Sequence, residues 1–230
     1  MKNVLKFTVQ IRAGILRSAT ILAMVGMLLL VPSAFAATIF VANASFESLP
    51  TGWPNVTCGG TCAYSVGLPI PSWNSTGSET GQWRTGGFAG NPPAIDGSIL
   101  AYTNGGTISQ DVGSAVAGVT YTLQVDVLHR TDEALTGVVQ LEIGGLVVAT
   151  APVVDGGPGT WSNWTAVDTA TAAQTGQTLT ILLSASGGQG DFDNVRLNST
   201  GSSVPEPASC ILVGAALAGL TTWRLRRKSA

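Results

Sequence analysis

The strongest constraint on the fold is a series of short runs, within residues 37–198, in which apolar and polar side chains alternate. The clearest run covers residues 120–130, where Tyr121, Leu123, Val125 and Val127 occupy every second position. A period of two places one set of side chains on one face of a β-strand. Gly, Asn and Pro bound the runs, and no stretch shows a sustained helical period. The region is therefore predicted to be an all-β domain.

The runs predict strands at 38–42, 98–103, 107–112, 120–130, 138–143, 146–150, 161–167, 178–185 and 191–197. Asn104-Gly105 and Gly144-Gly145 each separate two runs and are typical of tight β-hairpin turns. Eight or nine short strands with such turns predict a jelly-roll type β-sandwich over residues 37–197. Residues 48–93, rich in Pro, Gly and Trp, are predicted to be mostly loop, and residues 198–203 a polar linker.

The N-terminal 36 residues have the three parts of a secretory signal peptide. A basic region precedes an apolar stretch at residues 19–31, and Ala34-Phe35-Ala36 forms a cleavage site of the A-x-A type. The predicted mature chain starts at Ala37 and is exported across the inner membrane.

The last 27 residues, 204–230, also have three parts. The first is Val204-Pro205-Glu206-Pro207, and the second is a run of 16 uncharged residues, 208–223, predicted to be a transmembrane helix. At about 1.5 Å per residue this run spans roughly 24 Å of the roughly 30 Å hydrocarbon core, a gap that snorkelling and local thinning can close. The third part is a basic cluster, which stays in the cytoplasm by the positive-inside rule. It consists of Arg224, Arg226, Arg227 and Lys228.

The order and the residues of this tail resemble the PEP-CTERM sorting signal of bacteria that make extracellular polysaccharide. The resemblance covers residues 204–230 only. It implies that an exosortase, a membrane-embedded cysteine protease, recognises the Pro-Glu-Pro motif and processes the protein. The expected location is then the cell envelope or the extracellular matrix, after transient or permanent anchoring in the inner membrane. A plain C-terminal membrane anchor is the alternative.

Charge narrows the range of partners. Between residues 37 and 203 there are three basic and twelve acidic residues, a net charge of −9. Such a domain repels nucleic acid and anionic lipid and favours metal cations or neutral partners. Nucleic-acid binding is therefore excluded.

Cys58 and Cys62 lie four residues apart in Cys-Gly-Gly-Thr-Cys, within the exported region. An oxidising compartment favours a disulfide across this small loop. The alternative, a zinc site, needs two further ligands, and the region has one His and no other Cys.

A second resemblance covers residues 37–198. The order of several short motifs is similar to that of the galactose-binding-like β-sandwiches, which include many carbohydrate-binding modules. These motifs are Asn43-x-x-Phe46-Glu47, Ile108-Ser109-Gln110, Tyr121-Thr122-Leu123, Gly159-Thr160-Trp161 and Phe192-Asp193-Asn194-Val195-Arg196-Leu197.

This resemblance implies a structural calcium ion held by Glu47 and Asp193, because many modules of the fold use the Glu of an opening Phe-Glu and the Asp of a closing Asp-x-Val. Calcium takes six to eight oxygens, so backbone carbonyls and Asp191 would have to contribute. The alternative is that Glu47 caps a loop and Asp193 accepts a hydrogen bond in a turn.

Tryptophan supplies the candidates for glycan binding. Sugars pack their C–H faces on aromatic rings when polar groups orient them. Trp73 and Trp83, with Arg84 and Glu79 nearby, are the preferred candidates, and packing in the core is the alternative for each ring. Trp161 and Trp164 are three apart on one strand and are therefore predicted to point to opposite faces.

Catalytic motifs are missing from the sequence. There is no Gly-x-Ser-x-Gly, no His-Glu-x-x-His and no phosphate loop, and His129 lies on the apolar face of its predicted strand. We therefore expect a structural or adhesive protein near extracellular polysaccharide, with weak glycan binding and no enzymatic activity. A secreted polysaccharide-active hydrolase with two catalytic carboxylates is the alternative. A matrix protein without any ligand is the third interpretation.

Overall fold

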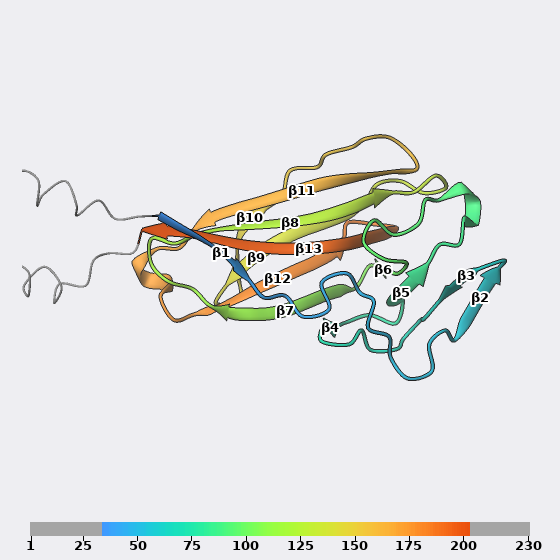
Figure 1. Cartoon of the computed structure of the whole chain (residues 1–230), viewed down its shortest axis with the longest axis horizontal. Coiled ribbons are helices and arrows are strands. Elements are labelled where there is room, and N and C mark those ends of the chain that lie inside the picture. Colours follow the sequence, from blue (N-terminus) through green and yellow to red (C-terminus); the bar gives the residue numbers. More distant parts are fainter. Residues whose placement is uncertain (1–33, 203–230) are drawn as a thin grey trace, which may run out of the picture. The chain divides into compact units, whose positions relative to one another are not determined.

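The computed structural model describes residues 34–202 (Figure 1). Most of the predicted signal peptide, the motif 204–207, the predicted membrane segment 208–223 and the basic cluster lie outside the described residues. Within residues 34–202, no helix is both long and apolar enough to cross a membrane.

Almost every regular element is a β-strand, in agreement with the prediction of an all-β sandwich (Figure 1). The larger sheet contains β1 (Ala34–Ile39), β2 (Val56–Gly59), β3 (Cys62–Tyr64), β5 (Thr80–Arg84), β6 (Leu100–Asn104), β8 (Thr120–His129), β11 (Thr160–Thr169) and β13 (Gln189–Ser202). The smaller sheet contains β4 (Asn74–Ser75), β7 (Thr107–Ser114), β9 (Gly137–Ile143), β10 (Leu146–Thr150) and β12 (Thr178–Ala185). Two short 3-10 helices, η1 (Phe88–Gly90) and η2 (Ala172–Gln174), lie in connections.

The strand order is β11-β8-β13-β6-β5-β3-β2 in the larger sheet, with β1 also pairing with β13, and β10-β9-β12-β7-β4 in the smaller sheet. This order confirms a two-sheet sandwich, and the jelly-roll topology stays a prediction.

The main core lies between the two sheets. On β8 the alternating residues Tyr121, Leu123, Val125 and Val127 are all buried, as their period of two predicts. They pack in one cluster with the inward residues of the smaller sheet. These are Val139, Leu141 and Ile143 of β9, Leu179, Ile181 and Leu183 of β12, and Ile108 of β7.

One of the two predicted hairpins is wrong. Gly144-Gly145 does join β9 to β10, with Leu146 opposite Ile143. After Asn104-Gly105, however, the chain leaves the larger sheet at the end of β6 and enters the smaller sheet as β7. The Gly106 N–H bonds Thr103 Oγ1 at 2.9 Å, and Thr76 beside β4 bonds the start of β7. The turn therefore connects two layers instead of two paired strands.

The predicted linker over residues 198–203 is also corrected, because β13 continues to Ser202. Residues 198–200 pair with β8. On the other side of the strand, Thr38 Oγ1 donates to Asn198 Oδ1 at 3.1 Å, and Ser199 Oγ donates to the Ala37 carbonyl at 3.3 Å. These partners on β1 and β8 keep the polar Ser/Thr segment in the sheet.

The segment predicted to be mostly loop contributes four short strands. β2 and β3 form a hairpin, and β3 pairs with β5 through Tyr64 opposite Trp83. This extension widens the larger sheet beyond the smaller one at the end of the sandwich where β2 and β3 lie (Figure 1).

Candidate ligand-binding pocket

The larger sheet carries a second apolar cluster on its outer face. Tyr64 is paired with Trp83, Trp83 with Leu100, and Tyr102 with Asp191 across neighbouring strands. Directly opposed residues of an antiparallel pair share a face, so these side chains stand together on the side away from the core. The buried members of this cluster are Cys62, Trp83, Ala94, Leu100, Tyr102 and Leu128. An antiparallel sheet exposed to water on one face would carry polar residues here.

A pocket of about 330 Å³ opens above this cluster. This volume lies near the lower end of the range for small-ligand sites. Four aromatic side chains line it: Tyr64, Trp83, Phe88 and Tyr102. The other lining residues are Cys58, Val66, Glu79, Asn104, Arg130, Glu133 and Gln189.

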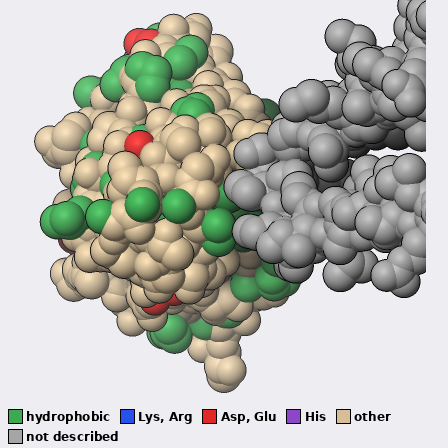
Figure 2. Space-filling view, turned by 90° about the vertical axis from the view of Figure 1, so that its left-hand side faces the viewer, with side chains coloured by type: hydrophobic (Ala, Val, Ile, Leu, Met, Phe, Trp, Pro, Cys, Tyr) green, Lys and Arg blue, Asp and Glu red, His purple; other side chains and the backbone are tan. Residues whose placement is uncertain are grey.

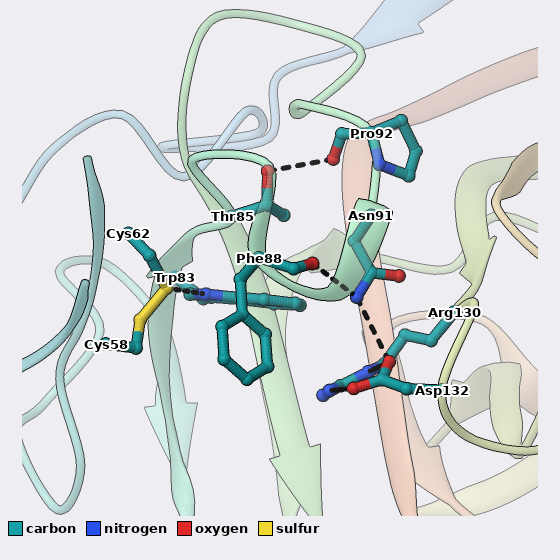
Figure 3. Close-up of a disulfide and its surroundings, with 9 residues drawn as sticks. All are labelled: Cys58, Cys62, Trp83, Thr85, Phe88, Asn91, Pro92, Arg130 and Asp132. Atoms are coloured by element: carbon teal, nitrogen blue, oxygen red, sulfur yellow. Dashed lines mark hydrogen bonds and ion pairs between the residues drawn. A yellow bond between two sulfur atoms is a disulfide. The ribbon is translucent and has the colours of Figure 1, made fainter. Parts of the chain in front are cut away.

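Cys58 and Cys62 form a disulfide that closes the β2–β3 hairpin beside the pocket (Figure 3). The indole Nε1 of Trp83 donates to Cys62 Sγ at 3.4 Å. Because Trp83 is only 4% exposed, this contact fixes its ring under the hairpin. Cys58 lines the pocket itself, so the disulfide forms part of the pocket wall.

The loop that contains η1 is tied to the loop after β8. Asn91 Nδ2 donates to Asp132 Oδ1 and to the Phe88 carbonyl, both at 3.0 Å (Figure 3). Asn91 Oδ1 accepts from the Thr131 N–H at 2.9 Å. These bonds hold Phe88, which is 42% exposed, at the edge of the pocket.

Arg130 is the only basic residue among the lining residues, and acidic partners already neutralise it. Its Nε and Nη2 donate to the two carboxylate oxygens of Asp132 at 2.9 and 2.7 Å, and Nη1 lies 3.6 Å from Glu133 Oε1. The guanidinium also stacks at 4.8 Å from the Trp83 ring centre. The hydrogen bonds from Arg130 lower the pKa of Asp132 to about 2. Arg130 therefore orients the pocket wall and offers little charge to a ligand.

Asp191 lies on the pocket side of β13, opposite both Tyr102 and Leu128, and is fully buried. Gln189 Nε2 donates to Asp191 Oδ1 at 2.6 Å. Oδ2 has no hydrogen-bond partner among residues 34–202. Burial raises the pKa of Asp191 to about 7, against the lowering effects of Gln189 and Arg130. Near neutral pH, Asp191 is therefore present partly as the neutral acid and partly as the anion.

Of the predicted glycan-binding residues, the structure brings Trp83 and the neighbouring Glu79 to the pocket. Trp73 is a core residue: it is 5% exposed, its ring centre lies 5.2 Å from that of Phe46, and its Nε1 donates to the Asn43 carbonyl at 3.1 Å. Arg84 follows Trp83 on β5 and therefore points to the other face, where it lies 5.2 Å from the Trp53 ring centre. Trp161 and Trp164 do point to opposite faces, and Trp164 is in the core.

Glu47 and Asp193 hold the same segment of chain. Glu47 Oε1 accepts from the N–H groups of Ser98 and Ile99, each at 2.7 Å. Asp193 Oδ2 accepts from the N–H groups of Ile95 and Asp96, each at 2.9 Å. Backbone N–H groups therefore occupy lone pairs of both carboxylates in this structure, and a calcium ion held by the pair stays a prediction. Among the described residues, no group of three His, Cys, Asp or Glu is arranged to hold a metal ion.

Most of the pocket-lining residues were not predicted from the sequence. They include Tyr64, Phe88, Tyr102 and Arg130. One signal was readable: Val127-Leu128 places apolar residues on both faces of β8, which indicates that this end of the strand is buried on both faces. The pairing of β3, β5 and β6 that collects the aromatic rings has no local signature.

The fold and the pocket together define a β-sandwich protein with an aromatic site on the outer face of its larger sheet. Residues 37–198 match the model of the HpiC1-like family, described as HpiC1 cyclase. The chain therefore belongs to the HpiC1-like family. No curated protein matches the sequence.

Several solved structures are similar. The apo form of a cyclase from Fischerella sp. has 21% identity and a TM-score of 0.58, and the match covers 74% of this chain and 98% of that one. A cyclase from Fischerella sp. TAU in complex with 4-(1H-indol-3-yl)butan-2-one has 21% identity and a TM-score of 0.56, over 73% and 100% of the two chains. A xylan-binding domain from Paenibacillus barcinonensis is more distant, with 13% identity and a TM-score of 0.46, over 74% and 99%. At these identities the likeness is one of fold.

Proposed function

We propose that the protein is an exported glycan-binding protein of the cell surface or matrix, without catalytic activity, and that the outer-face pocket binds a sugar unit of extracellular polysaccharide. One observation carries the proposal: four aromatic rings meet in a single pocket with carboxylate and amide groups beside them. Aromatic rings bind the C–H faces of a sugar, and the polar groups orient its hydroxyls. The predicted signal peptide and the resemblance of the tail to a sorting signal support export.

Phe88 provides the first test, because it lines the pocket and is exposed. In the full chain in detergent, we expect Phe88→Ala to weaken binding to a responsive polysaccharide about 10-fold, the loss that corresponds to removal of one aromatic contact of about 1.4 kcal/mol. Phe40→Ala is the matched control, because Phe40 is 82% exposed and does not line the pocket. Isothermal titration against a polysaccharide panel measures both. Equal effects of the two variants, or no binding by the folded protein, would contradict the proposal.

A second candidate is acid catalysis of the kind that the family description, a cyclase, suggests. The observation that favours it is Asp191, a buried carboxyl on the pocket side of β13 with one unpartnered oxygen among the described residues. With a pKa of about 7, Asp191 could donate a proton to a bound substrate at neutral pH. A catalytic role for this carboxyl would also suit the hydrolase alternative.

Two titrations separate the candidates. Tight binding of 4-(1H-indol-3-yl)butan-2-one, with no binding of any glycan, would favour the cyclase kind of activity. The non-catalytic proposal would be overturned if the protein converts a bound compound and Asp191→Asn abolishes this conversion without abolishing binding. We expect glycan binding and no conversion.

Calcium binding stays a prediction for Glu47 and Asp193. It requires that calcium raise the melting temperature of the full chain above its value in chelator, and that Glu47→Ala remove the increase. The same melting temperature in calcium and in chelator would leave the two carboxylates as anchors of residues 95–99 alone.

A further inference from the structure

We infer, on the basis of the glycan-binding function proposed above, that the pocket selects a sugar unit that carries a positively charged amine, namely an unacetylated amino sugar. The inference rests on three features of the pocket: its carboxylates, its lack of an available cation, and its aromatic walls.

The carboxylates come from three parts of the chain. Glu79 and Glu133 line the pocket and are exposed, and Asp191 lies fully buried on the same side of the sheet. Glu79 Oε2 accepts one bond, from Asn104 Nδ2 at 3.3 Å, and Glu133 Oε2 accepts one from the Gln189 N–H at 3.3 Å. Glu133 Oε1 also lies 3.6 Å from Arg130 Nη1. All three contacts are long, so each carboxylate keeps lone pairs that can accept bonds from an ammonium group.

Asp191 is an independent sign of a ligand. Its Oδ2 is buried without a hydrogen-bond partner among residues 34–202, although buried polar atoms normally have one. It lies on β13 two residues from Gln189, which lines the pocket, and opposite Tyr102, which lines it as well. Asp191 is fully buried and does not itself line the pocket, so a ligand donor would have to enter between Tyr102 and Gln189 to satisfy that oxygen.

No arginine of the described domain is free to form an ion pair with an anionic sugar. The described domain has three arginines. Arg130 is engaged by Asp132 and Glu133, Arg84 stacks on Trp53 on the other face, and Arg196 lies 3.5 Å from Asp126. Uronic acids would therefore meet like charges, which repel.

The aromatic walls favour a cation over a neutral sugar. Tyr64, Phe88 and Tyr102 present ring faces and edges around the pocket, with Tyr64 and Tyr102 at 6.2 Å between centres in an edge-to-face pair. Ring faces attract a cation, most strongly when water is excluded. Rings that pack on the C–H face of a sugar, together with carboxylates that accept bonds from an ammonium group, therefore favour a glucosamine unit.

The test compares four hexasaccharides on the full chain in detergent: glucosamine, N-acetylglucosamine, glucose and galacturonic acid. We expect the glucosamine hexamer to bind roughly 10-fold more tightly than the two neutral ones, as two partly exposed ion pairs would allow, and the galacturonic acid hexamer not to bind. The preference should weaken as salt is raised.

Because the whole domain is acidic, the decisive control is a variant with the same net charge as the test variant. Glu79→Gln with Glu133→Gln should remove the roughly 10-fold preference. Glu142→Gln with Asp168→Asn changes the charge equally at residues that do not line the pocket, and should leave the preference intact. Circular dichroism checks folding of both double variants.

The outcomes separate the two proposals. Equal binding of neutral and amino sugars, or an equal loss in both double variants, would overturn the selectivity and leave glycan binding in place. Binding of the galacturonic acid hexamer would also overturn it. Failure of every hexamer to bind the folded protein would overturn the glycan-binding function itself.

Discussion

Asp191 and Glu133 are both carboxylates of the pocket region, and their surroundings differ sharply. Asp191 sits in the middle of the larger sheet, on β13 between β6 and β8, and is fully buried. Glu133 lies in the loop after β8 and keeps 40% of its side chain exposed. Burial therefore raises the pKa of Asp191 in the sheet, whereas Glu133 in the loop stays accessible to solvent and lies 3.6 Å from Arg130 Nη1.

The raised pKa of Asp191 predicts a pH-dependent stability. The folded chain keeps this proton up to a pH of about 7, whereas a carboxyl with the ordinary pKa of 3.8 loses it earlier. Between these values the folded state binds more protons than the unfolded state, so the free energy of unfolding falls as pH rises. The contribution of Asp191 to this fall is at most about 4 kcal/mol. Burial raises the pKa of Asp193 to about 7 as well, which adds a change of the same sign.

Urea unfolding of the full chain at pH 4, 5.5 and 7 measures this dependence. Asp191→Asn should flatten it, because asparagine does not titrate. A stability that rises with pH over this range would contradict the burial of an uncompensated carboxyl.

At the scale of elements, the connection between β6 and β7 is the step that builds two layers. Gly105 and Gly106 lie next to each other there but have different surroundings. A Cβ on Gly106 would collide with the Thr76 carbonyl and with Thr103 Oγ1, whereas a Cβ on Gly105 would meet nothing within 4 Å. Gly105 instead has a positive φ of 78°, which any other residue adopts at a cost.

We therefore expect Gly106→Ala to lower the free energy of unfolding by about 3 kcal/mol, because backbone must move to make room. Gly105→Ala should cost about 1 kcal/mol, from backbone strain alone. Urea unfolding of both variants checks the order. Equal losses would contradict the close approach of Gly106 to the Thr76 carbonyl.

At the scale of the whole molecule, acidic residues outnumber basic residues four to one within residues 37–203. The face shown in Figure 2 carries apolar and acidic side chains with no visible Lys or Arg. All three arginines of the described domain are paired with an acid or an aromatic ring. Both ends of the described chain lie together, because β1 pairs with β13, and the β2–β3 hairpin lies at the other end of the sandwich (Figure 1).

The predicted sorting of the tail can be tested in the native host. If residues 204–207 are a processing motif, Pro205→Ala with Pro207→Ala should keep the chain in the membrane fraction at its unprocessed mass, whereas the unaltered chain should lose the tail. Mass spectrometry of the C-terminus decides. Identical fractionation and mass of both proteins would favour a plain membrane anchor.

Local sequence predicted those elements whose partner is also local. The residues of β8 alternate strictly, and β9 and β10 meet across two glycines, so both were readable from the chain itself. Trp73 and Trp83 look alike in sequence, yet one lies in the core and the other under the pocket. Burial of such rings depends on which sheet their neighbours join.

The sequence by itself determined the all-β class, the acidic character of the domain and the short spacing that favours a disulfide between Cys58 and Cys62. These follow from the period of two, the composition and the four-residue separation. Only the tertiary structure decided that β6 and β7 belong to different sheets. It alone gathered Tyr64, Trp83, Tyr102 and Asp191 on one face. Those contacts join strands that are far apart in the chain, and their register is set by packing of the whole sandwich rather than by any one segment.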